Sequence, residues 1–273
     1  VGANYAISMN SCTSALECAV KCIEKKGEII VPSFTWVSSA NAIINCGCIP
    51  VFVDINPDTR NIDYKKIESL INKKTVAIMV VHFSGLSCEM DKIIKICKKR
   101  NLQLIEDSAE TLGGKYKNKF TGSFGLGCFS FFPTKNITTT EGGMLTLNNK
   151  KMYEKAKKII AHGIVKSNKK SWKRVAVLPG HNYRLPNHLA LLGNSQLSKL
   201  KSFNKKRELI AKKYNNNFKK FNHIIKIPFI PKECNHVYQM YTVQVAKNLR
   251  NNFVNYLNKR GIGASVHFDP PLH

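Results

Sequence analysis

Short apolar runs alternate along the first 107 residues with segments whose apolar residues recur at helical spacing. A continuous apolar run predicts a strand buried on both faces, and helical spacing predicts an amphipathic helix. The runs predict strands at residues 1–8, 28–33, 48–55, 75–81 and 102–107. The segments between them predict helices at residues 14–26, 34–47, 64–72 and 89–100. This alternation is typical of an α/β domain with a mostly parallel, buried sheet.

The alternation becomes less regular after residue 107. Apolar runs predict two more strands, at residues 128–132 and 144–147. A basic helix is expected at residues 149–162, and a loop that contains Trp172 is expected at residues 163–184. The two strands are therefore the last that we assign to the buried sheet.

A long helical region with breaks is predicted at residues 186–221. Beyond it, the segments IIKIPFI, HVYQMYTVQV and ASVHFD predict strands around a helix at residues 249–260. These elements predict a small α+β unit. We therefore expect a large α/β domain at residues 1–200 and a small C-terminal α+β domain at residues 201–273.

Composition is that of a globular protein, because 43% of the 273 residues are hydrophobic. No apolar run approaches the ~20 residues of a membrane-spanning helix. There is no signal-peptide pattern at the N-terminus, so we expect a cytoplasmic protein without a membrane partner. The chain starts and stops beside strand-like segments, and we expect that both ends are truncated.

The net charge of +26 is compatible with an acidic partner. The excess is mostly lysine spread along the whole chain, without an arginine-rich cluster or zinc-finger spacing. A nucleic-acid binder therefore stays an alternative, and the expectation is no nucleic-acid partner. A basic surface would also attract a small anionic substrate.

Nine cysteines are present, and they contain no CxxC pair and no matching cysteine–histidine cluster. Most lie in apolar segments. We expect reduced, buried thiols in a reducing compartment, with no metal site.

Lys135 stands between an aromatic apolar run that ends at Phe132 and a threonine-rich turn that ends in Gly142 and Gly143. Two predicted strands would carry this lysine to the interior. An amine in an apolar interior loses its proton more easily than an exposed amine. The stretch therefore offers an amine that can form an imine with a carbonyl compound, although a solvated loop lysine is the alternative.

Two side chains follow the carboxyl ends of predicted parallel strands, where ligands of such sheets collect. Asp107 ends the strand at 102–107, and His82 follows the strand at 75–81. Asp107 can pair with a cation in a site, or it can cap the next segment. The turn at residues 10–14 opens a helix and can bind a phosphate through free N–H groups, although an ordinary N-cap would look the same.

Eight motifs in order resemble the DegT/DnrJ-type family of nucleotide-sugar aminotransferases, which depend on pyridoxal 5′-phosphate. The motifs are NSCTSAL, VPSFTWVSSANAI, PVFVDI, VHFSG, IEDSAETLGG, GSFGLGCFSFFPTKNITTTEGG, HNYRLP and VHFDPPLH. The resemblance implies the fold-type-I aminotransferase architecture, with a mostly parallel seven-stranded sheet and a smaller α+β C-terminal domain. It also implies a homodimer with composite active sites.

The resemblance assigns roles around the cofactor ring. Lys135 matches the lysine that forms the Schiff base and is the catalytic residue. Asp107 matches the aspartate that faces the pyridine nitrogen, where a carboxylate makes the ring an electron sink. Trp36 matches an aromatic residue that stacks on the ring.

Other matching residues are implied to bind phosphate or substrate. Cys12 and Thr13 fall in the phosphate-binding turn, and Ser130 matches a phosphate-binding serine. Asn182 matches an asparagine that one subunit contributes to the phosphate site of its partner. His267 lies in the tail motif near the sugar substrate.

Two positions depart from the family pattern. Glu110 stands where glutamine or histidine is usual against the other face of the cofactor, and it is expected to bind the cofactor or alter its affinity. Thr140 stands where glycine is usual, and it would be strained if the turn needs a positive φ.

The implied reaction moves an amino group from an amino acid, with L-glutamate expected, to a keto sugar of a nucleotide-sugar, for amino-sugar or glycan biosynthesis. A sugar dehydratase of the same family carries histidine at the lysine position, which Lys135 argues against. A regulatory or non-catalytic cofactor-binding protein is a further alternative. The nucleotide, the keto sugar and the carbon that is aminated stay open.

Overall fold

The computed structural model describes residues 1–166 and 172–273. The strands of its central sheet are β1 (Tyr5–Met9), β2 (Glu28–Pro32), β3 (Ile49–Val53), β4 (Thr75–Val81), β5 (Gln103–Asp107), β8 (Leu126–Ser130) and β9 (Gly143–Leu147). They lie in the order β1-β9-β8-β5-β4-β2-β3. Within this sheet β9 is antiparallel to both of its neighbours, and the other neighbouring pairs are parallel. The predicted α/β fold with a mostly parallel seven-stranded sheet is confirmed.

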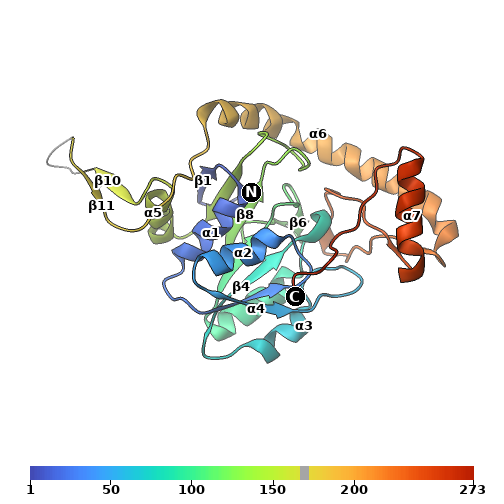
Figure 1. Ribbon diagram of the computed structural model, residues 1–273, viewed down its shortest axis with the longest axis horizontal. Coiled ribbons are helices and arrows are strands. Elements are labelled where there is room, and N and C mark those ends of the chain that lie inside the picture. The colour runs from blue at the N-terminus through green and yellow to red at the C-terminus, as the bar shows by residue number, and fades with distance from the viewer. Residues whose placement is uncertain (167–171) are drawn as a thin grey trace.

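Helices cover both faces of the sheet (Figure 1). One layer contains α1 (Cys12–Cys22), α2 (Val37–Asn45) and α5 (Lys150–Ile159), and the other contains α3 (Tyr64–Ile67) and α4 (Met90–Arg100). The side chains of a strand alternate between these two cores. In β2, Ile29 and Val31 join the first core and Ile30 joins the second. Because both faces are covered, the central strands are continuous apolar runs rather than alternating ones.

The connection after α5 is more ordered than expected. Strands β10 (Ile164–Lys166) and β11 (Arg174–Ala176) pair antiparallel, where the sequence predicted a loop over residues 163–184. The prediction is wrong for these strands, which carry no long apolar run because they lie outside the buried sheet. The part of the predicted loop at residues 167–171 lies outside the described residues, and Trp172 lies beside β11 in sequence.

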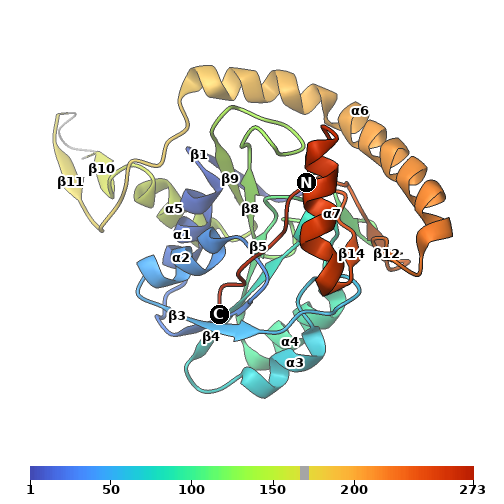
Figure 2. The ribbon, with the colours of Figure 1, turned by 45° about the vertical axis from the view of Figure 1, so that its right-hand side comes forward.

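Helix α6 (Asn187–Phe218) is continuous over 32 residues, so the predicted breaks in the helical region 186–221 are wrong inside it. Its sequence contains no proline, and one glycine, Gly193, is tolerated inside a helix. Figure 2 shows α6 running along the top of the molecule from the β10–β11 hairpin to the C-terminal elements. The predicted domain boundary near residue 200 lies within this helix and stays a prediction.

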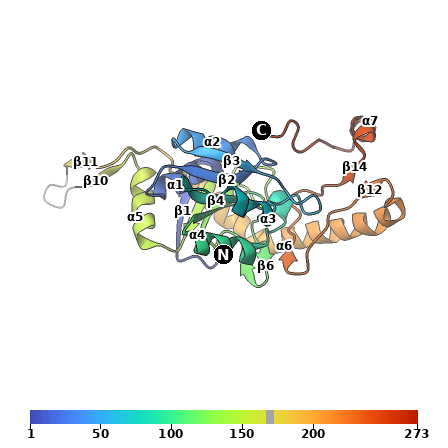
Figure 3. The same ribbon diagram turned by 90° about the horizontal axis from the view of Figure 1, so that it is seen from below.

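The C-terminal elements are β12 (Ile225–Lys226), β13 (Cys234–Asn235), β14 (Gln244–Val245) and α7 (Lys247–Lys259). Strand β12 pairs with β14, and β13 pairs with β6 (Lys115–Tyr116), which also pairs with β7 (Lys119–Phe120). The C-terminal elements and the β10–β11 hairpin lie at opposite ends of the molecule (Figure 3). Within the described residues, no helix is long and apolar enough to cross a membrane.

The predicted strand at ASVHFD does not form. This segment, residues 264–269, is irregular, and the tail after it bonds to the large domain, where Leu272 N–H donates to Ser33 O at 3.2 Å. Its side chains His267 and Phe268 line a cavity instead of a sheet.

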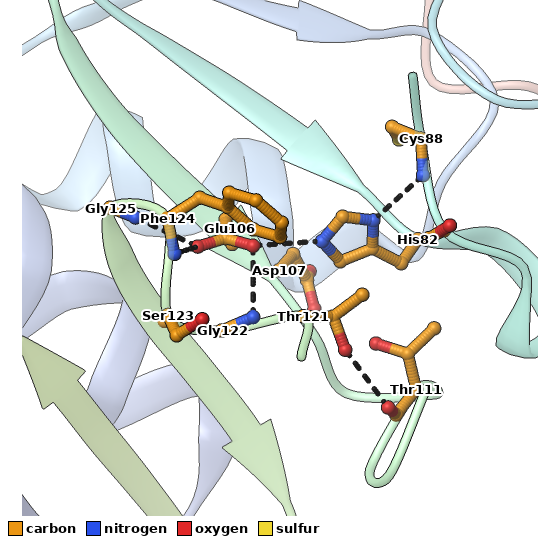
Figure 4. A network of polar contacts seen from close by, with 12 residues as sticks. His82, Cys88, Glu106, Asp107, Thr111, Thr121, Gly122, Ser123, Phe124 and Gly125 are labelled. Atoms are coloured by element: carbon orange, nitrogen blue, oxygen red, sulfur yellow. Dashed lines mark hydrogen bonds and ion pairs between the residues drawn. The ribbon is translucent and has the colours of Figure 1, made fainter. Parts of the chain in front are cut away.

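A buried carboxylate fixes the loop that leads into β8 (Figure 4). Glu106 of β5 accepts hydrogen bonds from three backbone N–H groups of the loop at residues 122–125, each at 2.8 Å. His82 Nε2 lies 3.2 Å from Glu106 Oε2, and His82 Nδ1 accepts from the N–H of Cys88. His82, which the sequence placed at a ligand-binding strand end, is fully buried and holds this network instead.

Candidate active site

A cavity of about 330 Å³ lies at the carboxyl ends of β4, β5 and β8. Parallel sheets bind ligands at this edge. Of the nine predicted site residues, all except Asn182 line the cavity: Cys12, Thr13, Trp36, Asp107, Glu110, Ser130, Lys135 and His267. These eight residues come from five separate parts of the chain and meet in one site.

Lys135 follows β8 and points its amine at a carboxylate. Its Nζ lies 3.5 Å from Glu110 Oε1, and the two side chains are 18% and 14% exposed. The second oxygen of Glu110 accepts the N–H of Ser84 at 2.6 Å. Burial raises the pKa of the Glu110 carboxyl, and Lys135 and the Ser84 N–H oppose that rise. Lys135 is thus neither a solvated loop residue nor surrounded by apolar atoms, because it has a buried acidic partner.

Asp107 ends β5 and is 6% exposed. Ser39 donates its hydroxyl hydrogen to Asp107 Oδ2 at 2.8 Å, and the Ala109 N–H donates to Oδ1 at 3.2 Å. Burial raises the pKa of Asp107, and these two hydrogen bonds act in the opposite direction. A buried carboxylate of this kind can bind a positively charged N–H group that enters the cavity.

The first turn of α1 forms another wall of the cavity. Ser11 is the N-cap and its side chain accepts the N–H of Ser14, which leaves the N–H groups of Cys12 and Thr13 at the start of the helix. Those groups have no acceptor within the helix and carry the positive end of its dipole. Gly143 of β9 permits this arrangement, because a Cβ there would lie 2.6 Å from Cys12 N. The turn is a suitable site for an anion such as a phosphate.

Two predicted residues in that turn have different surroundings. Thr13 Oγ1 lies 3.1 Å from Ser38 Oγ of α2 and so joins two elements of the cavity wall. The Cys12 thiol is held in its neutral form, since burial and then the Asp107 carboxylate raise its pKa well above the usual value. Ser130, at the end of β8, accepts the N–H of Phe132 at 3.3 Å.

Aromatic side chains line another part of the cavity. Trp36 is 62% exposed, and its ring centroid lies 6.3 Å from that of Phe268. Phe268 also contacts Phe34 and Phe83, with centroids 5.2 and 6.0 Å away. His267 lies beside this group, 3.3 Å from the Ser265 hydroxyl. An exposed ring such as that of Trp36 leaves a flat apolar face for a ligand.

Asn182 does not line the cavity of its own chain, and its side chain is exposed. Its neighbours His181 and Tyr183 are fixed to α1, because His181 pairs with Lys21 and the Tyr183 hydroxyl donates to Glu17. Side chains alternate in an extended segment. Asn182 therefore points away from α1 when its two neighbours point toward it.

Sequence reasoning missed three polar residues at the site. Ser39 bonds to Asp107, Ser84 bonds to Glu110, and Gln239 Nε2 donates to Thr134 O at 3.1 Å. Each of these bonds joins residues that are 26 or more positions apart in the sequence. Such long-range partners leave no local pattern. The only signal for Ser39 was its place in the serine-rich helix of the motif VPSFTWVSSANAI.

Comparison with known proteins identifies the family. The model of the DegT/DnrJ/EryC1/StrS aminotransferase family matches residues 1–273. The chain belongs to this family. Among its curated relatives is a UDP-4-amino-4,6-dideoxy-N-acetyl-beta-L-altrosamine transaminase of Campylobacter jejuni, 38% identical over 99% of this chain and 73% of the relative. Another is GDP-perosamine synthase of Caulobacter vibrioides, 36% identical over 98% of this chain and 73% of the relative.

The fold of this aminotransferase is also that of solved sugar aminotransferases. PseC of Helicobacter pylori, an aminotransferase involved in the biosynthesis of pseudoaminic acid, superposes with a TM-score of 0.93. The two are 34% identical, and the match covers 100% of this chain and 74% of PseC. The chain is therefore a pyridoxal-phosphate-dependent aminotransferase of the sugar-modifying type.

The cavity of this aminotransferase has the groups that pyridoxal 5′-phosphate requires. It offers an amine for the aldehyde, a buried carboxylate for the pyridine nitrogen and a helix N-terminus for the phosphate. In the part of the chain that the structure describes, Gln239 Oε1 is also buried without a hydrogen-bond partner. Since Gln239 lines the cavity, this oxygen is a free acceptor for a bound polar group.

Proposed function

We propose that this aminotransferase moves an amino group from an amino acid, with L-glutamate as the expected donor, to a keto sugar carried by a nucleoside diphosphate. The observation that carries the proposal is that Lys135 and Asp107 meet in one cavity beside the N-terminus of α1. When bound there, the cofactor supplies an aldehyde that carries the amine and a ring that takes up electrons. The product would be an amino sugar for glycan biosynthesis.

Lys135 is the proposed catalytic residue, because it is the amine in the cavity. It would bind the cofactor aldehyde and, once displaced by the donor, move a proton as general acid and base. Asp107 would hold the pyridine N–H, oriented by the hydrogen bonds from Ser39 and Ala109. Trp36 and Glu110 would lie against the two faces of the ring.

The phosphate would be bound by Cys12, Thr13 and Ser130, through backbone N–H groups and hydroxyls around the first turn of α1. We infer that Asn182 completes this phosphate site in the partner subunit of a homodimer. Its exposure and its absence from the cavity of its own chain support this role. His267 is proposed to contact the sugar substrate, since it lines the cavity and comes from the C-terminal segment.

The nucleotide part of the substrate is inferred from charge and from the relatives. A net charge of +26 favours the approach of a diphosphate. The names of the two relatives contain a UDP sugar and a GDP sugar, so both nucleotides are candidates. The UDP sugar is a 4-amino sugar, which makes a 4-keto sugar the first acceptor to test. We propose a cytoplasmic location, since nine free thiols suit a reducing compartment.

Cofactor trapping tests the role of Lys135. Borohydride is expected to link pyridoxal 5′-phosphate covalently to the protein, and mass spectrometry of peptides should locate the link on Lys135. Lys135→Ala should abolish both the link and transamination, by at least about a thousandfold for activity, since a general acid–base and a nucleophile are lost together. A link that persists in Lys135→Ala would contradict the assignment. Lys150→Ala, at an exposed lysine on α5, is the control and should be trapped normally.

Substrate assays separate the alternatives. Glutamate should convert the bound cofactor to its amine form, and a panel of 4-keto and 3-keto sugars linked to UDP or GDP should then restore the aldehyde form. A protein that binds the cofactor without this conversion would be a non-catalytic family member. Loss of a hydroxyl from the sugar without transfer of nitrogen would identify a dehydratase.

A further inference from the structure

The cavity is acidic for a site that receives an anionic cofactor. Three carboxyl groups line it, from Asp107, Glu110 and Glu141. Among the described residues that line it, Lys135 is the one lysine or arginine, and His267 is the one histidine. A phosphate and its ring therefore bring further negative charge to a site that already has more carboxyl groups than cations. The first turn of α1 offsets part of this charge for the phosphate.

The three carboxyl groups are not equivalent. Asp107 is oriented by Ser39 and can bind the pyridine N–H, so its charge has a partner when the cofactor is present. Glu110 has Lys135 as its partner at 3.5 Å, and that partner is the nitrogen that the cofactor takes. Glu110 is thus the buried carboxylate that loses its own counter-charge when the cofactor binds.

Glu110 is held in the cavity by hydrogen bonds, so it cannot turn toward solvent when it loses Lys135 as its counter-charge. The Ser84 N–H holds its Oε2 at 2.6 Å, and the Ser84 hydroxyl in turn donates to Met240 O at 2.9 Å. The backbone of Ser84 has a φ of 61°, a conformation that is fixed by its surroundings rather than preferred. A carboxylate held in this way has to remain buried whether or not its cation is available.

We propose that Glu110 is the counter-ion of Lys135 before the cofactor binds, and that loading of pyridoxal 5′-phosphate is coupled to uptake of one proton by Glu110. This inference rests on the proposed placement of the cofactor in this cavity. Lys135 Nζ bonds to the aldehyde carbon, and one water leaves. The nitrogen keeps its positive charge, now shared with the anionic oxygens of the cofactor, so the proton that neutralises Glu110 comes from the solvent.

The proposal fixes the direction of a pH effect. Burial already raises the pKa of Glu110 in the cofactor-free protein, and Lys135 opposes that rise. Removal of Lys135 from the pair would raise the pKa further, so loading takes up a proton at a pH where Glu110 starts ionised. Affinity for the cofactor should then fall as the pH rises. Asp107, Cys12 and Glu141 are the other acidic groups that face the cavity, and they are the same in a Glu110 variant.

Glu110→Gln isolates this effect, because an amide oxygen can still accept the Ser84 N–H but the side chain cannot ionise. The dissociation constant of pyridoxal 5′-phosphate is measured by absorbance titration between pH 6 and pH 9 for both proteins. The ratio of the wild-type to the variant constant cancels the titration of the cofactor itself. We expect this ratio to rise with pH in favour of the variant, by up to about tenfold for each pH unit, as one coupled proton requires. A ratio that does not change with pH would overturn the proposal.

Direct proton uptake gives a second readout. In weakly buffered solution, at the pH where the ratio of dissociation constants changes most steeply, the wild type should take up more protons per site than Glu110→Gln does on loading, with about one as the limit. Equal uptake would contradict the coupling. Glu110→Asp keeps a carboxyl group and should keep the pH dependence.

A matched control is Glu89→Gln, which removes a carboxyl whose pKa is also raised by burial but which does not line the cavity. It should follow the wild type at every pH.

Borohydride trapping of each variant separates a failure of the proposed function from a failure of the proposed role of Glu110. Failure to trap the cofactor on Lys135 in the wild type would contradict the proposed function, whereas trapping with a flat ratio would contradict the role of Glu110 alone.

Discussion

Thr140 has a backbone conformation that β-branched residues rarely adopt. Its φ is 65°, in the left-handed region that favours glycine. The sequence comparison with the family pattern predicted strain here if the turn needed a positive φ, and the structure confirms that it does. The turn is held by Thr138, whose Oγ1 accepts the Thr140 N–H at 2.8 Å. The next residue is Glu141, which lines the cavity. The conformation of Thr140 therefore affects where the backbone of Glu141 lies.

Thr140→Gly should therefore stabilise the protein. Relief of the left-handed conformation gains about 1–2 kcal/mol, and the greater freedom of glycine in the unfolded chain costs about 0.5–1 kcal/mol, so we expect a net gain of about 0.5–1 kcal/mol. Urea unfolding at a fixed protein concentration measures it. Thr140→Ala keeps the strain but loses the hydroxyl that donates to Thr139 O. A gain as large in Thr140→Ala as in Thr140→Gly would show that strain is not the cause.

The network around Glu106 shows how one strand fixes an adjacent element. Glu106 comes from β5, and the N–H groups that it binds belong to the loop at residues 122–125 before β8. The Ser130 at the end of β8 lines the cavity, and Lys135 follows five residues later. The buried carboxylate thus sets where β8 begins and contributes to the position of the lysine. Gly122, with a φ of 76°, is needed because a Cβ would lie 2.1 Å from the ring of Phe129.

Glu106→Gln should be strongly destabilising for a change that preserves size. The amide nitrogen of the new side chain would face backbone N–H groups that now donate to a carboxylate oxygen. At least one hydrogen bond to a charged group would be lost, and the buried N–H that made it would have no acceptor. Such losses cost about 2–4 kcal/mol. Glu154→Gln, at an exposed pair with Lys157 on α5, should change the stability by less than about 0.5 kcal/mol. Similar unfolding midpoints for the two variants would rule out this account of the network.

The sequence predicted elements well wherever burial on both faces left a simple pattern. Strands such as Thr75–Val81 and Gln103–Asp107 are continuous apolar runs and were found within a residue of their bounds. The short strands β6, β7 and β13 were missed, whereas β12 and β14 lie within segments that were predicted as longer strands. Strand β13 pairs with β6, and Cys234 faces Tyr116 across 117 intervening positions of sequence. A two-residue strand depends on a distant partner and carries no periodicity of its own.

The site was predicted to a similar extent and for a similar reason. Lys135 and Asp107 were recognisable because each follows a buried strand, and the topology of a parallel sheet brings strand ends together. The pairing of Lys135 with Glu110 was not predicted, because it depends on how the segment after β5 folds back. Ser84 and Gln239 were missed because they bond to residues that are distant in sequence.

The segment that contains Asn182 is hydrogen-bonded to α1, the helix whose first turn lines the cavity of the same chain. Asn10 N–H donates to Tyr183 O at 2.8 Å, and Asn10 directly precedes the N-cap Ser11. The Tyr183 hydroxyl donates to Glu17 of α1, as described above. The segment that points Asn182 outward is thus anchored on the helix whose first turn is the proposed phosphate site. In a symmetric dimer, each chain would give one such side chain and receive one.

Mixed dimers test this composite site. Lys135→Ala and Asn182→Asp should each be inactive or nearly so, since the first lacks the amine and the second sets a negative charge against the phosphate. A heterodimer of the two contains one site with both defects and one site with neither. Co-expressed with different affinity tags and purified, it should recover about half of the wild-type activity per dimer, as one intact site of two requires.

The matched control pairs Lys135→Ala with Asp107→Ala, which lie in the same cavity of one chain. Each site of that heterodimer then contains a defect, and activity should stay low. If the first heterodimer is also inactive, Asn182 does not act across the dimer. If instead the control recovers as well, Lys135 and Asp107 do not belong to one site.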